Sequence, residues 1–139
     1  MSNIHEKFSY FVIECQFIEE QLRKGILLCT NEIKLSLVKF NSKIVYNISN
    51  EELRYLSMKE LIKRFDKFTE DKNLIKDLYN LAKIRNISVH KEFLILGERK
   101  NFVKDYLQEG EDRLNTATII AEDCFKRLTN LILGYNSKT

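Results

Sequence analysis

The sequence predicts an all-α protein, an antiparallel bundle of about four or five helices, folded as a single domain over residues 1–139. Its 139 residues include no proline and only four glycines, so few residues interrupt a helix. Apolar residues recur at intervals of three and four, and the hydrophobic fraction of 44% suffices for one core. Because each long helix is apolar on one side only, the helices must bury these stripes against one another.

A long first helix is predicted by one apolar stripe near the amino terminus. The stripe consists of Ile4, Phe8, Phe11, Cys15, Ile18, Leu22, Ile26, Cys29 and Ile33. It can be followed onward through Leu37, Phe40 and Ile44. Thr30 and Asn31 can equally start a new helix, so a break near residue 30 and a continuous helix both remain open.

Two short helices are predicted next by capping boxes, Ser49-x-x-Glu52 and Ser57-x-x-Glu60. In this pattern the hydroxyl and the carboxylate reciprocally satisfy amide donors that a helix start leaves unpaired. We expect the second of these helices to end near Phe68.

Two further long helices complete the predicted bundle. One starts near Asp71 and ends between His90 and Phe93, with a connection over residues 94–97. Its stripe is Leu74, Leu78, Leu81, Ala82 and Val89. The stripe of the last helix is Val103, Tyr106, Leu107, Leu114, Ala117, Ala121, Cys124, Leu128 and Leu131, and Gly134 is placed to cap its end.

The amino-terminal segment and the cysteines predict a cytoplasmic protein. Residues 1–7 lack the basic and apolar regions of a signal peptide, and no apolar run reaches the length of a membrane span. We therefore expect no membrane association. Cys15, Cys29 and Cys124 lie far apart at apolar helical positions, so they are interpreted as reduced core residues, with no metal and no cofactor expected.

The net charge of +3 and the pI of about 8.7 permit contact with nucleic acid without arguing for it. Residues 83–104 hold six basic and two acidic side chains, a local excess of four positive charges. On charge alone, a solvated helix face with a basic loop is the preferred explanation of that excess. Glu19 and Glu20 are likewise interpreted as part of a solvated helix face.

The helix that carries this basic stretch places a charge among its apolar positions. At 100° per residue, Arg85 falls about 20° from Leu74, inside the apolar arc. A guanidinium left unpaired there costs several kcal/mol. Arg85 should therefore have a specific partner, or the arc should open onto an interface or a cleft.

Asn86 and His90 lie four residues apart and share one helix face, at the edge of the apolar arc and beside Tyr79 and Lys83. Arg, Asn and His thus converge near the end of one helix, as a site for an anionic ligand requires. A structural interpretation stays open, because a histidine near a helix end interacts favourably with the helix dipole and an arginine stem can cover apolar surface.

Residues 78–93, with Arg85-Asn86 followed by His90, resemble the signature of the HEPN superfamily. Residues 56–65 also resemble the short helix that often precedes the motif helix in that superfamily. The resemblance implies a metal-independent endoribonuclease of the toxin or defence type, or an inactive relative used for binding. It further implies a homodimer that brings two copies of the motif to one cleft.

The resemblance assigns catalytic roles to Arg85, Asn86 and His90. Cleavage of RNA by its own 2′-hydroxyl needs a proton acceptor, a proton donor and positive charge at the phosphate. His90 suits the proton transfers, Arg85 offers fixed donors to phosphate oxygens, and Asn86 would orient them. The substrate-binding candidates are Lys83, Lys91 and Tyr79, whereas His5 is interpreted as a surface residue.

Two alternatives remain beside the ribonuclease. One is a noncatalytic helical module that dimerises or binds a protein, such as the nucleotidyltransferase-type antitoxin associated with some HEPN proteins. The other is sequence-tolerant nucleic-acid binding through the local positive excess, which a steep salt dependence of affinity would support.

Overall fold

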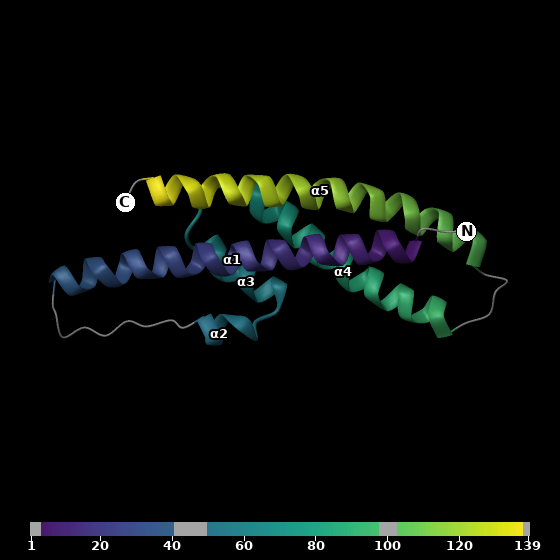
Figure 1. Ribbon diagram of the computed structural model, residues 1–139, viewed down its shortest axis with the longest axis horizontal. Helices are drawn as coiled ribbons and strands as arrows, with labels where there is room; N and C mark the ends of the chain where they lie inside the picture. Colours follow the sequence, from purple (N-terminus) through teal and green to yellow (C-terminus); the bar gives the residue numbers. More distant parts are fainter. Residues whose placement is uncertain (1–3, 41–49, 98–102, 138–139) are drawn as a thin grey trace.

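The computed structural model describes the backbone of residues 4–40, 50–97 and 103–137, and the side chains of residues 6–37, 39, 51–86 and 112–134. This part of the chain forms five helices and no strand (Figure 1). They are α1 (Ile4–Phe40), α2 (Asn50–Arg54), α3 (Met58–Asp66), α4 (Lys72–Gly97) and α5 (Val103–Ser137). The predicted all-α helical bundle is confirmed.

Helix α1 is continuous through the point where a break was considered. The Thr30 hydroxyl donates to the carbonyl oxygen of Ile26 at 2.6 Å, so it is satisfied inside the helix rather than capping a new one. The predicted stripe is buried from Phe11 to Cys29. Ile33 is 37% exposed, so the carboxyl-terminal end of α1 leaves the core.

Helices α1 and α5 run side by side in the same direction (Figure 1). Tyr10 bonds to Glu122 and Gln21 to Thr129, pairs separated by 112 and 108 residues. This nearly constant separation is the mark of a parallel pair. Helix α4 runs in the opposite sense and crosses the pair obliquely (Figure 1), so the antiparallel arrangement applies to α4 and not to α1 with α5.

The short helices pack on α1, and α3 begins as its capping pattern predicts. The Ser57 hydroxyl accepts from the Glu60 amide at 3.2 Å, which confirms the N-cap of α3. Asp71 plays the same role for α4, because its carboxylate accepts from the Leu74 amide at 3.0 Å. The Ser49 capping box lies outside the described residues.

Two predicted helix ends were wrong. Helix α4 continues to Gly97, through the segment expected to be a connection, because residues 94–96 are apolar and none of them breaks a helix. Gly134 does not cap α5, which extends to Ser137, and no glycine in the described part of the chain has a positive φ angle. The Gly134 error took a glycine as a helix cap that the backbone did not need.

The core is one cluster to which α1, α3, α4 and α5 all contribute. Phe65 of α3 is fully buried, and its ring lies directly against Gly25 of α1. The three cysteines are buried and unbridged, as predicted. None of the described helices is long and apolar enough to cross a membrane.

Candidate functional site

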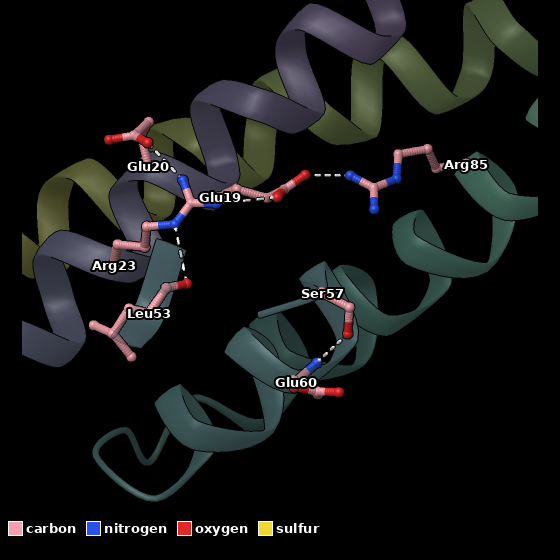
Figure 2. A network of polar contacts seen from close by, with 7 residues as sticks. All are labelled: Glu19, Glu20, Arg23, Leu53, Ser57, Glu60 and Arg85. Atoms are coloured by element: carbon pink, nitrogen blue, oxygen red, sulfur yellow. Dashed lines mark hydrogen bonds and ion pairs between the residues drawn. The ribbon is translucent and has the colours of Figure 1, made fainter. Parts of the chain in front are cut away.

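Arg85 of α4 has the specific partner that its position in the apolar arc demanded. Its Nη1 donates to Oε1 of Glu19, which reaches across from α1 (Figure 2). The two side chains are 22% and 14% exposed, so the ion pair is largely withdrawn from solvent. The pair therefore gives the guanidinium a compensating charge within one copy of the chain.

Glu19 also pairs with Arg23, one turn further along α1. Arg23 Nη2 lies 3.4 Å from Glu19 Oε2, and Arg23 Nη1 donates to Glu20 (Figure 2). Arg23 Nε donates to the carbonyl oxygen of Leu53 in α2 at 3.4 Å. The network thus links α2, α1 and α4, and Glu19 is its centre.

The prediction that Glu19 and Glu20 belong to one solvated face was wrong for Glu19. The Glu19 side chain is 14% exposed, whereas the Glu20 side chain is 64% exposed. Glu19 points between the helices because two arginines compensate its charge there.

A cleft of about 810 Å³ opens beside this network, between α1, α2 and α4. Its lining residues are Val12, Gln16, Phe17, Glu19, Glu20, Arg23, Arg54, Arg85 and Asn86. Arg54 is exposed, and none of the described residues forms an ion pair with it. The cleft therefore combines three arginines, two glutamates, two amide side chains and an aromatic ring.

The structure brings together two of the predicted site residues. Arg85 and Asn86 both line the cleft, and Asn86 is exposed. Lys83 is exposed and Tyr79 packs partly buried against the core, and neither of these two described residues lines the cleft.

The other predicted residues lie outside the described side chains. The backbone of His90 and Lys91 is part of α4, and that of His5 is part of α1. Because α4 is helical from Asn86 through His90, these two positions are stacked one turn apart.

Sequence reasoning missed Phe17, Glu19, Arg23 and Arg54. A signal existed for Glu19, which falls about 40° from Cys15 at 100° per residue, at the edge of the α1 stripe. A carboxylate and an arginine at the margins of two apolar stripes are natural partners. No comparable signal marked Arg54, because its place at the cleft depends on how α2 packs against α1.

Glu19 and Glu20 compensate Arg23 and Arg85, so Arg54 is the arginine of the cleft that is best placed to bind an anion. Among the described residues, no cluster of His, Cys, Asp or Glu is arranged to hold a metal ion. Burial raises the pKa of the Cys15 thiol to about 12, so this thiol is not a nucleophile at neutral pH. Comparison with known protein families, curated proteins and solved structures gives no match.

Proposed function

We propose that this chain is a HEPN-like, metal-independent endoribonuclease of the toxin or defence type that acts as a homodimer. The observation that carries the proposal is that Arg85 and Asn86 line an arginine-rich cleft on the helix that holds His90 one turn later. Positive charge for a phosphate and a group that titrates near neutrality would thus lie on one helix.

His90 would act as general acid and base on the two oxygens of the scissile phosphodiester. One copy accepts the proton of the 2′-hydroxyl, and the second copy's His90 donates a proton to the departing 5′-oxygen. Arg85 would stabilise the charge that develops on the phosphate. Glu19 engages one of the five guanidinium donors of Arg85, which leaves others for phosphate oxygens.

RNA cleavage in the presence of EDTA tests the chemistry. We expect products with 2′,3′-cyclic phosphate ends, and we expect cleavage to be lost in His90→Ala and Arg85→Ala. Circular dichroism shows whether each variant remains folded, and Lys59→Ala serves as the control because Lys59 is exposed on α3. Full activity of either folded variant would remove its residue from the mechanism.

Disulfide cross-linking tests the composite site. In a homodimer that shares one cleft, His90→Cys should cross-link across the two-fold axis, whereas Lys59→Cys should not. Light scattering measures the dimer beforehand. A dimer that cross-links at Lys59 and never at His90 would place the two motifs apart and exclude acid and base from one cleft.

A noncatalytic helical module is the second candidate, and the Glu19–Arg85 pair favours it. An arginine already paired within the chain can serve to hold α4 against α1. Three large apolar side chains of α1, Tyr10, Ile13 and Phe17, are also 45–50% exposed, which suits a protein partner such as an antitoxin. This function predicts no cleavage and a stable complex with that partner.

A further inference from the structure

Phe17 is a half-exposed aromatic ring at the rim of the arginine-rich cleft. It is 50% exposed, although its neighbour Ile18 is fully buried. Leaving a ring in water forgoes the stabilisation that its burial would provide. Such a ring beside positive charge is suited to a ligand with a flat apolar face.

The ring of Phe17 is supported from α5. Its centroid lies 6.2 Å from that of Phe125, at an interplanar angle of 51°, and Phe125 packs partly buried against the core. This contact restrains Phe17 while half of its surface stays accessible. A restrained ring loses little conformational entropy when a second ring stacks on it.

The cationic groups of the cleft differ in how strongly they are engaged. Arg23 is committed to Glu19, to Glu20 and to the backbone of Leu53. Arg54 is exposed and forms no ion pair with any residue in the described part of the chain, so its guanidinium can take an incoming anion. Phe17 and Arg54 line the same cleft from α1 and α2.

We propose that this cleft binds an unpaired segment of RNA, with a base stacked on Phe17 and an adjacent phosphate held by Arg54. The choice of RNA rests on the proposed function. The choice of an unpaired strand rests on Phe17, because bases become available for stacking on a side chain where they leave the helix. The volume of about 810 Å³ lies within the range of about 300–1,000 Å³ common for ligand sites.

Fluorescence anisotropy with a labelled single-stranded RNA measures the role of Phe17. All proteins carry His90→Ala, so that the RNA stays intact. Phe17→Ala and Phe17→Leu should each bind about 5- to 150-fold more weakly, and Phe17→Tyr should bind like the parent. The matched control is Ile13→Ala, because Ile13 is 45% exposed on the same helix and does not line the cleft.

The salt dependence of the same binding measures the role of Arg54. Arg54→Gln should weaken binding and reduce the slope of log affinity against log salt by about one, since one phosphate contact is lost. Lys59→Gln, which removes an exposed charge outside the cleft, should leave the slope unchanged.

The outcomes separate this inference from the proposed ribonuclease. If RNA binding depends on Phe17 and the unmodified protein does not cleave RNA, RNA binding in the cleft is supported and the proposed ribonuclease activity is excluded. If cleavage requires His90 but Phe17→Ala and Ile13→Ala bind RNA equally well, the proposed stacking site on Phe17 is overturned and the proposed ribonuclease activity stands. Duplex RNA bound as tightly as the single strand would also overturn the inference.

Discussion

Replacing Gly25 by alanine should destabilise the protein, although alanine is the better helix former. A Cβ atom at Gly25 would lie 2.7 Å from Cε2 and 3.3 Å from Cδ2 of Phe65. The ring is fully buried in the core, so a shift away from the new Cβ atom would have to displace the side chains packed around it. The close approach of α1 and α3 therefore requires the missing side chain.

Two opposing effects determine how much Gly25→Ala changes the free energy of unfolding. Alanine gains about 1 kcal/mol over glycine inside a helix. Forcing an extra carbon into a packed core costs about 1–3 kcal/mol. The net change for Gly25→Ala is thus a loss of about 0–2 kcal/mol in the free energy of unfolding.

Gly134→Ala is the matched control. A Cβ atom at Gly134 would meet no atom within 4 Å, so alanine there should stabilise α5 by up to about 1 kcal/mol. Because the helix-propensity gain largely cancels between the two variants, their difference of about 1–3 kcal/mol reports the cost of the contact with Phe65.

Urea denaturation followed by the helical circular dichroism signal measures both variants at one protein concentration. In a Phe65→Leu background the ring is gone, and Gly25→Ala should then stabilise the protein. If Gly25→Ala stabilises the unmodified protein as much as Gly134→Ala does, Phe65 yields freely and the tight contact between α1 and α3 is refuted.

Three further predictions concern the ion pairs and the buried thiols. A double-mutant cycle of Glu19→Ala and Arg85→Ala should give a coupling of about 1–2 kcal/mol in urea denaturation, since both side chains are mostly withdrawn from solvent; purely additive effects would contradict the pair. Burial raises the pKa of Cys15 to about 12 and that of Cys124 to about 11, from an ordinary value of 9.0. Above pH 9 the unfolded thiols lose protons that the folded ones keep, so the free energy of unfolding should fall by about 1.4 kcal/mol per thiol per pH unit up to about pH 11; a flat profile would contradict burial. Arg127→Met should cost about 1 kcal/mol in the same denaturation assay and less in high salt, because its carboxylate partners on α4 and α5 are 40% and 61% exposed; a cost that salt does not change would argue against the ion pairs.

Local chemistry predicted most of the fold. The predicted stripes are buried from Phe11 to Cys29 in α1 and from Leu114 to Leu128 in α5, and Ser57 caps α3 through its hydroxyl. These features depend on residues within one or two helical turns of each other. The continuity of α1 at Thr30 and the extension of α4 to Gly97 were harder, because no residue there forces either outcome.

The relative direction of the long helices required tertiary information. An apolar stripe fixes which side of a helix is buried and says nothing about whether its neighbour runs with it or against it. Here α4 returns the chain to the end where α1 begins, so α5 runs parallel to α1 (Figure 1). The Tyr10–Glu122 and Gln21–Thr129 hydrogen bonds join the two helices in this register.

The sequence predicted that Arg85 needs a partner or an opening, but it did not predict which residue is the partner. The position of Arg85 required a partner or an opening, and the structure provides both, in Glu19 and in the cleft. The identity of the partner depended on which helix packs against α4, and that is a property of the whole bundle. The place of Arg54 in the cleft likewise depends on tertiary packing, in this case of α2 against α1.

The Glu19–Arg85 pair places two demands on one guanidinium. As part of the scaffold, Arg85 should stay bound to Glu19, because a largely buried charge without a partner destabilises the bundle. As part of a phosphate site, it should offer donors to an anion that Glu19 repels. The planar guanidinium can meet both demands, since an Nη1 bond to the carboxylate leaves further donors at fixed angles. Lysine has a single ammonium group and no such fork. A lysine at this position could therefore not pair with Glu19 and bind a phosphate in the same fixed geometry.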